Sequence, residues 1–362
     1  MQGYVLVTRN HLEIPVGGIK LGLFDILQID ATVDNDVGAM YQRRLDDLEL
    51  ADELGFDVAF CAERHFLATH AASSATAWIA AASQRTGRMR LGAMGYTLPI
   101  RHPVQLAEDV AILDILSQGR LEVGFGIGHR VDELIALGAD PARRIQDFQE
   151  RYAILRALWT GGQVSFERGD LHLKEVAVSP LPVQSPHPPL WYAGTEPGAA
   201  QWMGAQGLGL AAGFRTAAEL KPAIDAFRVG RDARSAGVRE SEPHRPLGSI
   251  ALMRAVVVGE TDERAKQAVV EELVKHRASG GAEESRADRY REAEEYFASL
   301  VAGEVMLAGS SETVALAIRA LQAELGFDLF LANVYPMGAQ PERVRETLRL
   351  LAGPVRAGLT AG

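Results

Sequence analysis

The chain has 362 residues, a hydrophobic fraction of 47% and a formal net charge of −10. This length and composition predict a folded protein with a large core, and the negative charge argues against a surface that binds nucleic acid. No apolar run reaches the roughly eighteen residues that a membrane helix needs, and no signal-peptide pattern opens the chain, so we expect a cytoplasmic protein without a membrane anchor. The single cysteine, Cys61, excludes disulfides within the chain and multi-cysteine metal sites.

The order of apolar segments along the chain alternates between strand and helix patterns. Residues 1–18 show no periodicity, so we expect an N-terminal arm followed by one domain over 19–362. Short apolar runs predict strands near residues 20, 58, 91, 122, 191, 209, 252 and 329. Helical patterns follow nearly all of them, the clearest covering residues 39–54, 74–85, 145–159, 261–276 and 341–351.

The stretch from residue 89 to residue 128 is the most complete of these units. A strand over 89–98 precedes a helix in which Leu106, Val110 and Leu113 recur at i, i+4 and i+7. Gly119 ends that helix, and a second apolar strand runs into the glycines of LEVGFGIG. The pattern therefore predicts two parallel strands joined by a helix.

Eight strand–helix units without an obvious linker predict one (β/α)8 barrel, a TIM barrel. A doubly wound open sheet is the main alternative, although its nucleotide-binding form would need a GxGxxG turn after the first strand, which this chain lacks. The charged segment 277–307 is too long for a simple loop. We interpret it as an insertion after strand seven that contains a polar helix, either a mobile lid or a solvated excursion.

Chemistry in such a barrel belongs at the carboxyl ends of the strands, which defines the candidate residues. No HxH, HExxH or GxSxG pattern occurs, so neither a metal site nor a serine nucleophile is expected. Glycines and a Gly-Thr pair before a helix are typical of a phosphate site, so we expect a phosphorylated cofactor. The candidates at the strand ends are Glu63, Arg64 and His65, residues 95–97, residues 128–130, Gly194 and Thr195, Arg254 and Asn333.

Four segments, taken together, resemble the bacterial luciferase-like flavin-dependent monooxygenases. They are AERHF at 62–66, the stretch 98–128, PLPVQSPHPPLWYAGT at 180–195 and GSSETVALAIRALQAELGFD at 309–328. The resemblance implies a (β/α)8 barrel that binds reduced FMN at the strand ends, activates O2 as a flavin hydroperoxide and oxidises a small organic substrate. It also implies a separate flavin reductase that supplies reduced FMN, as in two-component systems, and a homodimer formed through the early helices.

The resemblance also implies which residues contact the flavin. In the family an arginine in the loop after strand four binds the flavin phosphate, and here His129 stands at that place, between Gly128 and Arg130. Ala193, Gly194 and Thr195 match the strand-five positions beside the phosphate. Gly95, Tyr96 and Thr97 would lie beneath the isoalloxazine ring, where the family often has a cis peptide bond that does not precede proline.

The two catalytic candidates depart unequally from the family pattern. Bacterial luciferase has Glu-His-His-Phe after strand two with a catalytic first histidine, and this chain has Arg64 at that place. Because arginine cannot act as a base near neutral pH, light-emitting aldehyde oxidation is not expected. His65 is then the candidate for proton transfer, with a structural role at the rim as the alternative.

Two other functions are compatible with the same sequence. The superfamily includes deazaflavin-dependent enzymes that transfer hydride without oxygen. The departures at Arg64 and His129 would also suit a catalytically silent subunit that only binds flavin.

Overall fold

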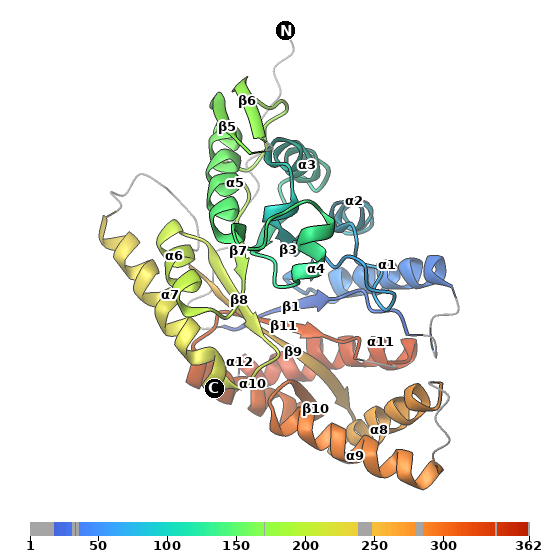
Figure 1. Cartoon of the computed structure of the whole chain (residues 1–362). Coiled ribbons are helices and arrows are strands. Elements are labelled where there is room, and N and C mark those ends of the chain that lie inside the picture. Colours follow the sequence, from blue (N-terminus) through green and yellow to red (C-terminus); the bar gives the residue numbers. More distant parts are fainter. Residues whose placement is uncertain are drawn as a thin grey trace.

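Eight parallel strands close into a barrel in the computed structural model, which describes residues 18–30, 33, 36–169, 171–237, 248–279, 285–336 and 339–360 (Figure 1). Neighbouring strands pair in the order β9, β11, β1, β2, β3, β4, β7, β8, and pairing of β8 with β9 closes the ring. Closure confirms the (β/α)8 prediction and excludes the open sheet. The expected N-terminal arm falls almost wholly outside the described residues. The barrel strands are β1 (Lys20–Asp25), β2 (Val58–Cys61), β3 (Arg90–Thr97), β4 (Leu121–Gly126), β7 (Leu190–Ala193), β8 (Gly209–Gly213), β9 (Ile250–Gly259) and β11 (Leu329–Asn333).

Helices surround the barrel because each has one apolar stripe to bury against it. In α3 the predicted stripe of Leu106, Val110 and Leu113 is buried, and in α10 Val314 and Ile318 are buried in the same way. The helices that follow or flank the barrel strands are α1 (Val37–Glu53), α2 (Ala75–Arg85), α3 (Pro103–Leu116), α5 (Arg144–Trp159), α6 (Pro197–Gln206), α7 (Ala217–Gly237), α10 (Ser311–Leu325) and α11 (Pro341–Leu350).

The strands divide their side chains between the barrel interior and the outer layer beneath the helices. Phe60, Met94 and Trp191 belong to the interior cluster, whereas Cys61 and Ala93 belong to the outer cluster. This alternation is the two-residue period of a strand. It decides which strand residues face the barrel axis.

The connection from β9 to β11 is longer than a single helix. β9 outruns the barrel, and residues 255–259 pair with an additional strand, β10 (Met306–Ser310). Two helices, α8 (Asp262–Ser279) and α9 (Arg286–Ala302), pack on this extension around Val257 and Leu273. The polar helix expected within 277–307 is therefore present as α9. The helix expected over 261–276 belongs with this excursion, because α10 is the helix that packs on the outer layer of the barrel.

Several short elements had no counterpart in the sequence analysis. They are the 3-10 turn η1 (Leu98–Ile100), α4 (Val131–Ala136), the π turn η2 (Leu351–Val355) and α12 (Arg356–Thr360). The hairpin expected near residues 164–178 is present as β5 (Val164–Arg168) and β6 (Leu171–Val176). No helix among the described residues is long and apolar enough to cross a membrane.

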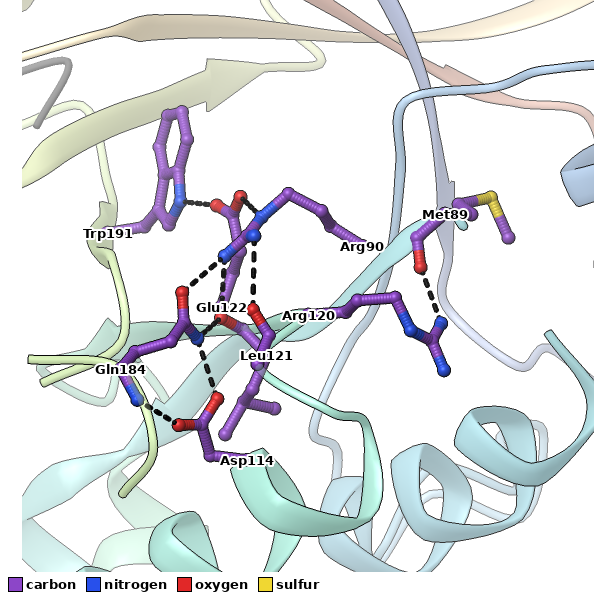
Figure 2. Close-up of polar contacts among 9 residues, drawn as sticks. Met89, Arg90, Asp114, Arg120, Leu121, Glu122, Gln184 and Trp191 are labelled. Carbon is purple, nitrogen blue, oxygen red and sulfur yellow. Dashed lines mark hydrogen bonds and ion pairs between the residues drawn. The ribbon is translucent and has the colours of Figure 1, made fainter. Parts of the chain in front are cut away.

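A polar network fastens the proline-rich segment before β7 to the amino-terminal end of the barrel (Figure 2). Gln184 donates to Asp114 Oδ1 at 2.6 Å and accepts from Arg90 at 3.0 Å. Arg90 donates to Glu122 at 2.5 Å, and the Trp191 indole N–H donates to the same carboxylate. Every buried carboxylate here has a donor, so the network stabilises this end of the barrel and leaves the other end for ligands.

Candidate active site

The carboxyl ends of the strands and the loops that follow them form the rim of the barrel. The structure places four predicted groups there: residues 63–65 after β2, 95–97 at the end of β3, 128–130 after β4 and 193–195 at the end of β7. The first three are joined by direct contacts. Arg130 donates to the carbonyl oxygen of His65 at 3.0 Å, and Glu63 accepts a bond from the Thr97 backbone N–H at 3.0 Å.

Glu63 is a buried carboxylate that connects β2 to β3. Its side chain accepts from Thr97 and from the guanidinium of Arg101, which follows η1. Burial alone would raise the pKa of Glu63, but His65, Arg101 and the Thr97 N–H together hold the pKa below its usual 4.5. Glu63 is therefore ionised at neutral pH and fixes the end of β3. The sequence analysis placed Glu63 at the rim but missed its partner Arg101.

His65 lies against this carboxylate. Its Nε2 atom is buried, lies 3.5 Å from Glu63 Oε1 and lacks hydrogen-bond geometry. Its carbonyl oxygen accepts from Arg130, so the β4 loop holds its backbone in place. The His65 ring thus lies against the Glu63 carboxylate.

Gly95 lies where β3 and β4 approach each other most closely. The Met94–Gly95 peptide bond is cis, as the family resemblance implied. A Cβ atom at position 95 would lie 2.5 Å from the Gly124 carbonyl carbon, so only glycine fits. Gly95 is partly exposed whereas Tyr96 is fully buried, and the Tyr96 hydroxyl lies 3.2 Å from Thr76 Oγ1 on α2. Tyr96 therefore supports the rim from the outer layer.

The end of β4 is a run of exposed backbone. Gly126 is partly exposed, and a Cβ atom there would have no heavy atom closer than 4.0 Å. Gly128 has a φ of +82°, and a Cβ atom there would lie 2.7 Å from Leu134 and 3.0 Å from Thr97 Cγ2. Glycine at 128 lets the chain turn sharply against β3, and glycine at 126 leaves an open surface.

Arg130 is paired with carboxylates within the protein. Beyond its bond to the His65 carbonyl, it donates to Asp132 and lies 3.9 Å from the buried Glu133 on α4. His129 is exposed beside it; partial burial, and then the positive charge of Arg64, lower the pKa of His129. At neutral pH His129 is therefore uncharged, and the β4 loop offers less free positive charge than its sequence suggests.

Arg64 differs from Arg130 in its partners. It lies in the loop after β2, two residues beyond Ala62, whose side chain belongs to the interior cluster. Its guanidinium makes one long bond, 3.5 Å to the Glu63 carbonyl oxygen, and no carboxylate of the described residues lies within 4.0 Å of it. Burial lowers the pKa of Arg64, while Glu133 opposes that change.

The segment after β7 does not offer the free helix terminus that the sequence suggested. Gly194 and Thr195 precede α6 as expected, and Ala193 joins the interior cluster. The carboxylate of Glu196, however, caps the helix by accepting from the N–H groups of Gly198 and Ala199. The sequence analysis missed this cap, although an acidic residue followed by proline is a recognisable helix start.

Two further candidates lie away from the rim surface. Arg254 is fully buried on the outer side of β9, donates to the Met253 carbonyl oxygen and has its pKa lowered to about 10 by burial. Asn333 is buried and accepts from the Tyr335 backbone N–H. Cys61 is buried and free, as expected. No group of three or more possible metal ligands occurs among the described residues.

Comparison with known proteins agrees with this geometry. The family model for luciferase-like monooxygenases matches residues 19–329. An uncharacterised protein, y4wF, of Sinorhizobium fredii is 32% identical over 68% of this chain and 69% of its own length. Limonene 1,2-monooxygenase of Rhodococcus erythropolis is 33% identical over 36% of this chain and 34% of its own. The oxygenase component of the flavin-dependent trigonelline monooxygenase of Acinetobacter baylyi is 28% identical over 44% of each.

Solved structures show the same fold over nearly the whole chain. Monooxygenase RslO1 of Streptomyces bottropensis aligns with a TM-score of 0.76 and 26% identity over 92% of this chain and 98% of its own. The oxygenating constituent of 3,6-diketocamphane monooxygenase from Pseudomonas putida, in complex with FMN, aligns with a TM-score of 0.75 and 18% identity over 94% of this chain and 98% of its own. An F420-dependent secondary alcohol dehydrogenase aligns with a TM-score of 0.69 and 19% identity over 93% of this chain and 99% of its own. The eight-stranded barrel and the family match over residues 19–329 show that this chain belongs to the luciferase-like monooxygenase family.

Proposed function

We propose that this protein is a flavin-dependent monooxygenase that uses reduced FMN and O2 to oxidise a small organic substrate. The observation that carries the proposal is the glycine backbone at the ends of β3 and β4, next to the ionised Glu63. Relatives named by activity include limonene and trigonelline monooxygenases, which supports an oxygenase. The oxygenase-component name of one relative supports a separate flavin reductase as partner. A cytoplasmic homodimer remains part of the proposal.

The rim fits a flat aromatic cofactor. Gly95 and Gly126 are partly exposed, and the position of a Cβ atom at Gly126 is open, so a planar ring can approach the backbone there directly. Met94 and Ala193 supply apolar surface from the interior cluster below. Gly128 and Thr195 lie at the ends of β4 and β7, where the phosphate of FMN would be held.

Bound reduced FMN would be the group that reacts with O2. The protein would bind and orient the flavin and protect it from water. Glu63 holds Thr97 and so fixes the backbone under the ring. His65, whose Nε2 atom lies 3.5 Å from Glu63 Oε1, is the group at the rim that we propose for proton transfer. Arg64 stays protonated near neutral pH, so it contributes positive charge and cannot act as a base.

Equilibrium dialysis without oxygen tests the choice of cofactor. We expect reduced FMN to bind and reduced deazaflavin, at the same concentration, to bind at least about tenfold more weakly, a difference of about 1.4 kcal/mol. The reverse preference would favour the hydride-transferring alternative. Binding of reduced FMN without reaction toward any candidate substrate would favour the silent subunit.

A further inference from the structure

Two arginines of the rim, Arg64 and Arg130, differ in the partners of their guanidinium groups. Arg130 donates hydrogen bonds to the His65 carbonyl oxygen and to Asp132, and it also forms an ion pair with Glu133. Among the described residues, Arg64 makes only the long bond to the Glu63 carbonyl oxygen, although a guanidinium carries five N–H donors. Of the two, Arg64 has more donors left for a ligand and has no carboxylate partner within 4.0 Å in the described part of the chain.

Arg64 lies just beyond the carboxyl end of β2, at the rim where ligands bind in such barrels. Phe60 and Ala62, which precede it, belong to the interior cluster. Arg64 is half-buried, and its field reaches His129 and Arg130 of the β4 loop, which both lie near it. Its charge is therefore held in a partly desolvated place at the rim, where an unpaired charge is costly.

Two other sources of anion binding are used up within the protein. The amino terminus of α6 is capped by the carboxylate of Glu196, and the Arg130 guanidinium is paired with Asp132. An oxyanion near the β2 and β4 loops therefore meets unused guanidinium donors at Arg64. A guanidinium binds carboxylates and phosphates through two parallel hydrogen bonds, which suits this residue to that group.

We propose that Arg64 binds an oxyanion group of the ligand at the rim, which is either the phosphate of the flavin or a carboxylate of the organic substrate. This assigns Arg64 a binding role that replaces the catalytic histidine of the luciferase pattern. The inference rests on the proposed function for the source of the anion, but the free guanidinium itself does not depend on it.

Inorganic phosphate is the direct probe of the guanidinium. At constant ionic strength, phosphate should raise the thermal midpoint of the wild-type protein, and Arg64→Gln should abolish that rise. Arg64→Lys, which keeps the charge but not the planar fork, should retain part of it. Arg264→Gln, which removes an exposed arginine of α8 that pairs with Glu260, is the matched control and should respond as the wild type does.

FMN and riboflavin distinguish the source of the anion. If wild type binds FMN about ten- to a hundredfold more tightly than riboflavin and Arg64→Gln loses that preference, the anion is the flavin phosphate. If Arg64→Gln loses the phosphate response but keeps the preference for FMN, the anion belongs to the substrate. Circular dichroism of Arg64→Gln and Arg64→Lys confirms folding in both arms.

The proposal is overturned if phosphate leaves the wild-type midpoint unchanged, or if Arg64→Gln responds to phosphate and binds FMN as wild type does. Absence of flavin binding by the wild type, together with a phosphate response that depends on Arg64, would contradict the proposed function alone. The two failures are thus separable.

Discussion

Glu63 shows how one residue can organise the rim. A buried carboxylate without partners would be neutralised, because burial disfavours the charged form. Here the donors from Thr97 and Arg101 and the nearby His65 ring outweigh burial, so the carboxylate stays charged and joins three segments. Its charge stabilises the fold as well as the site.

Glu63→Gln should therefore lower the free energy of unfolding by about 2 kcal/mol at pH 7, since hydrogen bonds to a charged group are lost. The folded-state pKa of Glu63 lies below its ordinary 4.5, so its contribution is present above pH 4.5 and is lost as the pH falls through the folded-state pKa. Urea unfolding between pH 7 and pH 3 measures this. The difference in free energy of unfolding between wild type and Glu63→Gln should become smaller toward low pH. A difference that stays constant with pH would rule out the ionised carboxylate as its source.

At the scale of elements, the pairing of β3 with β4 decides the shape of the flavin surface. The register shifts between Ala93 and Tyr96, and Gly95 fills the point of closest approach. The surroundings of two glycines in this region differ. Gly95 lies against backbone that cannot yield, whereas Gly126 opens onto free surface.

Gly95→Ala should cost about 3 kcal/mol of stability, because its methyl group would lie 2.5 Å from the Gly124 backbone and force the strands apart. Gly126→Ala, with no heavy atom within 4 Å of its methyl group, should change stability by less than about 0.5 kcal/mol. It should nonetheless weaken FMN binding, since the methyl group stands on the surface that the ring approaches. Thermal unfolding and FMN titration of both variants measure this, and equal stability losses would contradict it.

The strands were predictable because each is a short apolar run that glycine or proline interrupts, and the buried stripe of α3 follows from Leu106, Val110 and Leu113 alone. Helix α4 was not predictable, because its six residues are too few to show a helical period. β10 exists only because β9 extends past the barrel and offers an edge, which is a tertiary fact.

The candidate site was predictable in its location and less so in its contacts. The strand-end rule placed residues 63–65, 95–97 and 128–130 at one rim, as the structure has them. The pairing of Arg130 with Asp132 and Glu133 was visible as close sequence neighbours, but the bond from Arg101 to Glu63 joins separate loops and leaves no periodic signal. The sequence alone did not show that Arg130 pairs with carboxylates whereas Arg64 has none within 4.0 Å among the described residues.

Across the whole molecule, the two ends of the barrel divide stability from chemistry. The proline-rich segment that helped to indicate the family reaches the amino-terminal end through Gln184, where its network holds Asp114 and Arg90 (Figure 2). That part of the resemblance therefore concerns the fold. The segment AERHF lies at the opposite end and carries the charges of the rim, so it is where this protein departs from luciferase.

The central claim is that the rim holds reduced FMN and lets oxygen react with it there. The most direct measurement is stopped-flow absorbance after the protein is titrated anaerobically with reduced FMN and then mixed with O2. The account predicts a transient absorbance band that free reduced FMN lacks, followed by slower appearance of oxidised FMN. Reoxidation at the rate of free flavin with no transient band would contradict it.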